Sequence, residues 1–214
     1  PGKPVLCFSR HLSTFETLLC RDDAEGRSLL MIMIRSEHAR DVKAREALLD
    51  EAFGLERHEK TCERLREGRV PVRGLSLVAE IEGRIVGTVR LWPVTIGSLN
   101  ALLLGPLAVS NDYRTQGIGA RLVRAALNRA VMQGHQAVIL VGDTAYYSRF
   151  GFSADVMTDI DLPGPVDRER LLGLELKEGA FAEARGIVAA AGEAVPSAIF
   201  TARKTRSRVI AQAA

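Results

Sequence analysis

The sequence predicts an α/β protein built on a mixed β-sheet, and three observations support this fold class. Short apolar runs alternate along the chain with amphipathic stretches of helical period. Two of these runs flank Glu82-Gly83, a pair that is typical of a hairpin turn. A glycine-rich helix start follows a third run. The resulting order of strand, two helices, three strands, helix, strand and helix is that of an α/β chain with a mixed sheet.

The elements of the first half are bounded by changes of period and by glycines. A buried strand is expected at Leu29–Ile34, and a helix begins at Ser36 and ends at Gly54. A second, charged helix at about 55–67 is expected to expose its charges. The next elements are hairpin strands at 75–81 and 84–91, a break at Pro93 and Gly97, and a strand at 101–109 that Gly105-Pro106 interrupts. The residues expected on the buried side of the first helix are Val42, Ala44, Ala47, Leu48 and Phe53.

The second half has one strong helix and weaker signals after it. A helical period covers Gly117–Met132 and stops at Gly134. A buried strand is expected at 137–141 and a short helix at 144–150, whereas 173–177 and 194–202 resemble short strands. The residues expected on the inner side of the long helix are Leu122, Val123, Ala126, Leu127, Ala130 and Val131.

The composition is that of a soluble globular protein. The 214 residues are 47% hydrophobic and 26% charged, and the formal net charge of +3 suits an anionic ligand but does not favour a nucleic-acid partner. The three cysteines have no metal-ligand spacing, so we expect no metal and a reduced, cytoplasmic setting. The longest apolar run is far shorter than the roughly 20 residues of a membrane span, and no signal peptide is recognisable. We therefore expect no membrane partner. We divide the chain into a loosely ordered extension (1–27), a globular domain (28–202) and a basic tail (203–214).

The segment Arg114-Thr115-Gln116-Gly117-Ile118-Gly119-Ala120 opens the long helix and favours an anion. A helix start presents free N–H groups, and glycines let a phosphate approach the backbone. A dinucleotide fingerprint would need a third glycine where Leu122 stands, and a nucleoside-triphosphate loop would need a Gly-Lys-Ser/Thr ending. The glycines alone leave open a helix start without any ligand.

The same segment resembles the acyl-coenzyme A signature Gln/Arg-x-x-Gly-x-Gly/Ala of the GNAT superfamily of N-acetyltransferases. A second match, from Gly142 to Phe152, resembles the Tyr-x-x-x-Gly-Phe stretch that follows the family's fifth strand. The resemblance covers about residues 28–200 and is nearest to a bacterial branch of predicted N-acetyltransferases. It makes 28–202 the N-acetyltransferase domain, and it implies a GNAT-like mixed, mostly antiparallel sheet flanked by helices, with a splay between strands four and five.

The resemblance also implies a cosubstrate and its site. Acetyl-coenzyme A would be the acetyl donor, and the acceptor would be a small-molecule or peptide amine that attacks the thioester directly, through a tetrahedral intermediate. Tyr147 matches the family's general-acid tyrosine, which protonates the leaving thiolate. The residues that would hold the acetyl-coenzyme A backbone are Leu107, Ala108, Val109, Arg114, Thr115, Gln116, Gly117, Ile118, Gly119 and Ala120.

Several alternatives stay open at this level. Tyr147 would instead serve only to pack against the cosubstrate, and Tyr146 is expected in the core or the pocket wall. A base is not assigned. Glu80 or Asp143 would act as one through water, or would only cap a helix or pair with an arginine, and the cap of the short helix is the better fit for Asp143. The acceptor loops are expected in 52–74 and 153–167. The chain would be a monomer or a homodimer. The alternative function is a non-catalytic coenzyme A-binding regulatory module on the same fold.

Overall fold

The computed structural model of the chain describes residues 31–59 and 61–195. Two compact units make up this part of the chain. Unit 1 contains residues 31–57, 73–91 and 104–134, and unit 2 contains the described residues of 58–72, 92–103 and 135–195. The predicted extension (1–27) and basic tail (203–214) lie outside the described residues, and the single domain at 28–202 stays a prediction.

The strands form a mixed sheet, which confirms the predicted fold class. Its strand order is β1-β2-β3-β4-β5-β7, and a short strand, β9, pairs with β3. The β1–β2, β2–β3 and β5–β7 pairs are antiparallel, and β4–β5 is parallel. The strands are β1 (Ile32–Ser36), β2 (Ser76–Ile81), β3 (Arg84–Ile96), β4 (Leu99–Val109), β5 (Ala137–Val141), β6 (Ile160–Asp161), β7 (Leu171–Glu175), β8 (Gly186–Ile187) and β9 (Ala189–Ala190).

The parallel β4–β5 register covers two residue pairs, Leu102–Val138 and Leu103–Ile139. β4 nevertheless continues to Val109 and β5 to Val141. The last part of each strand therefore lies outside the shared register, as the predicted splay requires.

The helices are short except for two, and several single turns of 3₁₀-helix connect them. None of the helices in the described ranges has the length and apolar character needed to cross a membrane. The α-helices are α1 (Val42–Phe53), α2 (Thr61–Arg66), α3 (Ile118–Met132) and α4 (Thr144–Tyr147). The 3₁₀ turns are η1 (Ala39–Asp41), η2 (Leu55–Glu59), η3 (Asn111–Tyr113), η4 (Ser148–Phe150), η5 (Asp155–Met157) and η6 (Arg168–Arg170).

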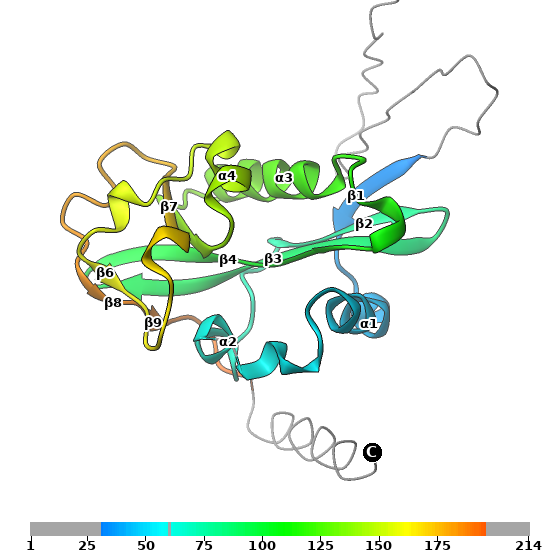
Figure 1. The fold of residues 1–214 in the computed structure, drawn as a ribbon, viewed down its shortest axis with the longest axis horizontal. Coiled ribbons are helices and arrows are strands. Elements are labelled where there is room, and N and C mark those ends of the chain that lie inside the picture. The colour runs from blue at the N-terminus through cyan, green and yellow to red at the C-terminus, as the bar shows by residue number, and fades with distance from the viewer. Residues whose placement is uncertain (1–30, 60, 196–214) are drawn as a thin grey trace, which may run out of the picture. The chain divides into compact units, whose positions relative to one another are not determined.

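In unit 1, α1 and α3 cover opposite faces of the strands (Figure 1). α3 presents an apolar stripe to the sheet, and it approaches β3 closely at Gly87. A Cβ at Gly87 would stand 2.9 Å from Leu122 Cδ1 and 3.1 Å from Ile118 Cγ2, so glycine is needed there for space. On the other face, Leu48 and Leu49 of α1 pack against Ala108 of β4.

The buried side of α1 also carries charge, which the sequence analysis missed. Arg45 is 1% exposed and pairs with Glu37 and Glu46, while Arg90 of β3 binds Glu37 at 2.5 Å. Arg57 then binds Glu46 at 2.5 Å. This alternation of charges fastens α1 to β3 and to η2, because a buried guanidinium needs such partners. The predicted inner residues Ala44, Ala47 and Phe53 are exposed instead.

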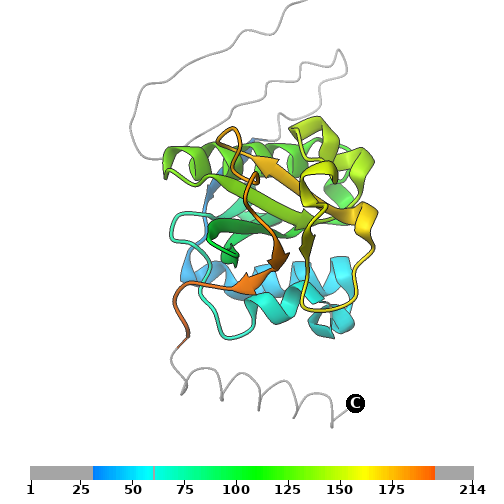
Figure 2. The ribbon, with the colours of Figure 1, turned by 90° about the vertical axis from the view of Figure 1, so that its left-hand side faces the viewer.

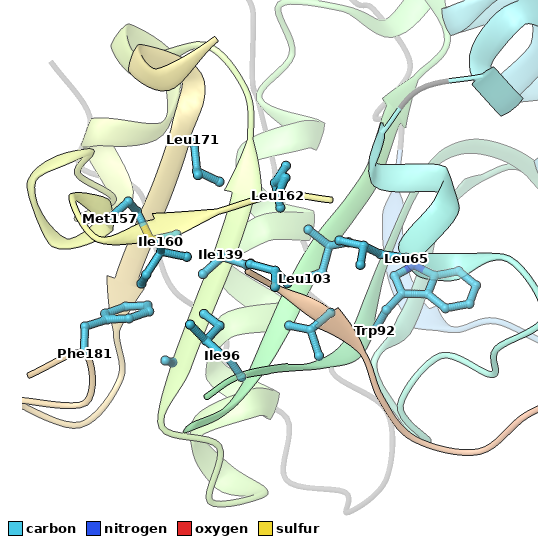
Figure 3. Packing of buried hydrophobic residues seen from close by; sticks show 14 residues of the cluster. Leu65, Trp92, Ile96, Leu103, Ile139, Met157, Ile160, Leu162, Leu171 and Phe181 are labelled. Atoms are coloured by element: carbon cyan, nitrogen blue, oxygen red, sulfur yellow. The ribbon is translucent and has the colours of Figure 1, made fainter. Parts of the chain in front are cut away.

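Unit 2 has its own apolar core, in which β4 and β5 contribute Leu103 and Ile139 (Figure 3). Phe181 and Met157 close one part of this core, and Trp92 of β3 lies in another (Figure 3). α4 and α2 lie on opposite sides of the strands of unit 2, and β6 and β8 form a separate parallel pair (Figure 2).

Some predicted boundaries are wrong, and each has a local reason. β3 continues through Pro93, which lies beyond the stretch that pairs with β2 and still accepts the N–H of Ala191 with its carbonyl at 3.1 Å. Proline lacks only the N–H donor, so it keeps this acceptor beside the β9 pairing. Val131, near the end of α3, is 53% exposed rather than inward. The first strand is displaced to Ile32–Ser36, and the charged segment 55–67 divides into η2 and α2. Of the strand at 194–202, Ala194 forms one bridge with Arg69, and the residues from 196 onward lie outside the described residues.

Candidate functional site

The predicted anion site of unit 1 begins where β4 ends. Ser110 donates its N–H to the carbonyl of Val86 at 2.9 Å, which fastens the end of β4 to β3. The η3 turn follows, and Tyr113 N–H returns to the carbonyl of Ser110 at 3.0 Å. The chain therefore enters the next segment from a fixed point on the sheet.

The turn from Arg114 to Gly117 is exposed and has an unusual backbone. Thr115 has a φ of 70° and Gly117 a φ of 76°, so two residues of the turn lie in the left-handed region. Glycine adopts this region without steric cost, whereas threonine does so rarely, and such residues gather at ligand sites. A Cβ at Gly117 would meet nothing within 4 Å, which leaves the space beside the backbone open.

The start of α3 has the free donors that a phosphate needs. Gly117 is the N-cap and has no side chain with which to cap the helix. The first helical bond runs from Arg121 N to Gly117 O at 3.1 Å, so the N–H groups of Ile118, Gly119 and Ala120 have no partner within the helix. Together with the helix dipole, these groups make a site that fits a pyrophosphate.

The predicted contact residues of this segment contribute in different ways. The Ile118 side chain is 1% exposed and packs on β3, so only its backbone N–H is available to a ligand. Ala108 is likewise buried against α1, while Leu107 and Val109 are half-buried. The contribution of 107–109 would therefore come from the backbone, as the family resemblance implies.

Tyr147 lies in unit 2, at the end of α4, within a group of aromatic rings. Its ring meets Tyr146 edge-on at 5.0 Å between centroids and Phe152 edge-on at 5.8 Å. Burial raises the pKa of the Tyr147 phenol well above its ordinary value, because the phenolate would lose its hydration. The hydroxyl therefore remains a proton donor at neutral pH.

The two carboxylates considered as bases are both engaged. Asp143 is the N-cap of α4 and accepts the N–H of Ala145 at 3.2 Å. Glu80 Oε2 accepts a hydrogen bond from Arg35 Nε at 2.8 Å and forms an ion pair with Arg35 Nη2 at 2.6 Å. Both residues therefore have the structural roles that compete with a base.

Arg35 is the centre of a buried charged group that sequence reasoning did not find. It is 6% exposed, and it donates to both oxygens of Asp41, at 2.6 and 3.0 Å. The hydrogen bond from Arg35 lowers the pKa of Asp41 to about 2, against the opposing effect of burial. The signal in the sequence that could have indicated this group is the position of Arg35 directly after an apolar run, because β1 extends through Arg35.

Comparison with known proteins places this geometry in a family. A model of the acetyltransferase (GNAT) domain matches residues 73–154, which include the α3 start and Tyr147. The uncharacterized N-acetyltransferase YhbS of Escherichia coli strain K12 is 34% identical over 131 residues, which are 60% of this chain and 78% of that protein. The chain belongs to the GNAT family of N-acetyltransferases. The predicted family and enzyme class are thereby confirmed.

Two solved structures of GNAT family members agree with this assignment. Escherichia coli YhbS in complex with coenzyme A aligns with a TM-score of 0.68 and 30% identity, over 78% of this chain and 93% of that one. A GNAT acetyltransferase of Brucella melitensis in complex with acetyl-coenzyme A aligns with a TM-score of 0.56 and 26% identity, over 74% of this chain and 94% of that one.

Proposed function

We propose that this N-acetyltransferase moves an acetyl group from acetyl-coenzyme A to a primary amine of a small molecule or peptide. Binding of the acetyl donor is supported above all by the start of α3, where Gly117 opens a helix whose first N–H groups lack helical partners. The solved relatives in complex with coenzyme A and acetyl-coenzyme A support the same ligand. Arg114, exposed beside these donors, adds a charge-assisted contact to the pyrophosphate.

The proposed chemistry is direct attack of a neutral amine on the thioester carbonyl. Formation of the C–N bond gives a tetrahedral intermediate. The C–S bond then breaks, and its electron pair leaves with the sulfur. Tyr147 donates its phenolic proton to that sulfur. The attacking nitrogen, which is protonated after the C–N bond forms, loses its extra proton to the phenolate or to water and becomes the neutral amide nitrogen. A backbone N–H in 107–109 would stabilise the oxyanion. We assign no base, because Glu80 holds Arg35 and Asp143 caps α4.

The experiment follows free thiol release from acetyl-coenzyme A with a panel of amines: polyamines, aminoglycosides, amino acids, peptide termini and lysine peptides. We expect at least one amine to accelerate thiol release. The variant Tyr147→Phe should then lose about a hundredfold or more in kcat while its Kd for acetyl-coenzyme A stays unchanged. Tyr146→Phe is the matched control and should change kcat by no more than about threefold.

Two results would contradict parts of this proposal. Unchanged turnover in Tyr147→Phe would remove that residue from the acid role. Tight acetyl-coenzyme A binding without thiol release to any amine, or to water, would instead favour a non-catalytic coenzyme A-binding module.

A further inference from the structure

The residue that follows β5, Gly142, lies against the Cδ2–Cε2 edge of the Tyr147 ring. A Cβ added at Gly142 would overlap the Tyr147 ring at Cε2 and would stand 2.7 Å from Cδ2. Side chains do not approach a Cβ so closely, so the ring occupies the place that any other residue at position 142 would need for its side chain.

Glycine is required at position 142 for space and not for backbone conformation. The left-handed backbone that favours glycine occurs at twelve other glycines of the described chain, among them Gly134 and Gly151, but not at Gly142. An alanine could therefore adopt the Gly142 backbone without strain. Its methyl group would conflict with one neighbour above all others, the Tyr147 ring.

The backbone beside this edge of the ring is held in place by several hydrogen bonds. Gly142 donates its N–H to the carbonyl of Arg170 at 2.9 Å, and Thr144 donates its hydroxyl to the carbonyl of Glu169 at 2.6 Å. Tyr147 N–H then bonds the carbonyl of Asp143 at 3.0 Å, which closes the turn of α4. The start of α4 is thus fastened to the segment before β7. A simple shift of the helix therefore does not relieve the clash between an alanine methyl group at position 142 and the Tyr147 ring.

Two other aromatic rings also contact the Tyr147 ring. Phe152 is 3% exposed and meets the Tyr147 ring at 75° between ring planes. Tyr146 meets it at 84°. With Gly142 against one edge and these two rings packed on it, the direction of the phenolic hydroxyl is determined by packing.

We propose that Gly142 is a positioning residue for Tyr147: the bare backbone at the end of β5 seats the phenol ring and fixes the hydroxyl that protonates the departing thiolate. This inference rests on the proposed acid role of Tyr147. Proton transfer requires the donor and acceptor atoms to be within hydrogen-bonding distance, and a displacement of about 1 Å can cost about a hundredfold in rate. A methyl group at position 142 displaces the ring on that scale.

The test is a double-mutant cycle on the full chain with Gly142→Ala, Tyr147→Phe and the double variant. The readouts are kcat for thiol release from acetyl-coenzyme A, with water and with the best amine of the panel, and the calorimetric Kd for acetyl-coenzyme A. We expect Gly142→Ala to lower kcat about ten- to a hundredfold with Kd unchanged. In the Tyr147→Phe background the same alanine should change kcat by less than about twofold, because the hydroxyl it displaces is already gone.

Gly173→Ala is the matched control for damage to packing. Gly173 lies on β7 beside β5, and a Cβ there would stand 2.7 Å from both Met157 Sδ and Val156 Cγ2, away from Tyr147. The thermal midpoint of the Gly173→Ala variant should fall as that of Gly142→Ala does, while the kcat of Gly173→Ala stays within about threefold of the parent chain. An equal loss of kcat in Gly173→Ala would mean a general effect of crowding and would overturn the proposal.

The remaining outcomes separate the two proposals. If Tyr147→Phe lowers kcat and Gly142→Ala does not, or if the two losses multiply in the double variant, the positioning role fails while the acid role stands. If Tyr147→Phe leaves kcat unchanged, the acid role itself fails and the positioning role fails with it.

Discussion

The contact between Gly87 and α3 links the stability of unit 1 to the proposed cosubstrate site. Gly87→Ala places a methyl group 2.9 Å from Leu122 Cδ1, 3.1 Å from Ile118 Cγ2 and 3.3 Å from Ala79 Cβ. Leu122 can rotate, but Ile118 is β-branched and lies in the first turn of the helix, so the helix start must move by a few tenths of an ångström. Overpacking of this kind costs about 1–3 kcal/mol in the free energy of unfolding.

Urea denaturation and calorimetry measure the two consequences of Gly87→Ala. We expect Gly87→Ala to lower the free energy of unfolding by about 1–3 kcal/mol. We also expect severalfold weaker binding of acetyl-coenzyme A, because the displaced N–H groups of Ile118, Gly119 and Ala120 no longer point together at the phosphate. Leu122→Ala in the same chain should partly relieve the crowding, so the two losses of stability should be less than additive by about 1 kcal/mol. Leu127→Ala, on the same helix but outside the contacts of Gly87, is the control. Its loss of stability should be additive with that of Gly87→Ala. A stability change below about 0.5 kcal/mol with unchanged Kd would refute this account of how α3 is seated.

Two further predictions follow from the perturbed pKa values. The pKa of Asp41 is lowered from 3.8 to about 2, so its ionised form stabilises the fold above the unfolded pKa, and this contribution is lost as pH falls through about 2. Asp41→Asn should therefore lower the free energy of unfolding by up to about 2 kcal/mol at pH 7, and by progressively less below pH 4, as measured by urea denaturation. A loss of stability that does not depend on pH would contradict the pairing of Asp41 with Arg35. Burial raises the pKa of Tyr147, so the absorbance difference between the parent chain and Tyr147→Phe should show no phenolate forming near pH 10; a normal titration there would mean that the ring is solvated.

The fold was readable where local pattern and tertiary packing agree. The α3 stripe from Leu122 to Ala130 has a strong 3.6-residue period, and the β2–β3 hairpin has a glycine at its turn. α3, β2 and the start of β3 are therefore predicted within one residue, whereas the end of β3 is not. α1 has no such agreement. Its buried side includes Arg45, which binds Glu37 eight positions away. Glu37 in turn binds Arg90, 53 positions away, so no local window could reveal this network of charges.

The site was readable only in part, for a similar reason. The glycines at 117 and 119 and the tyrosine at 147 are visible in the sequence because the family motifs that they match have those residue types at fixed spacing. The engagement of Glu80 by Arg35 is not visible, because it depends on the register between β1 and β2 and on the irregularity at Ala79/Glu80. The place of Gly142 against the edge of the Tyr147 ring likewise depends on how α4 follows β5.

The central claim is that the start of α3 holds the pyrophosphate of acetyl-coenzyme A, and calorimetric titration of the parent chain and Arg114→Gln tests it most directly. Arg73→Gln, another exposed arginine of unit 1, is the matched control. A charge-assisted contact contributes about 1.5–3 kcal/mol, so we predict saturable binding to the parent chain and to the control, and binding about ten- to a hundredfold weaker to Arg114→Gln. No binding heat from the parent chain at millimolar acetyl-coenzyme A, or equal Kd values in all three proteins, would contradict the claim.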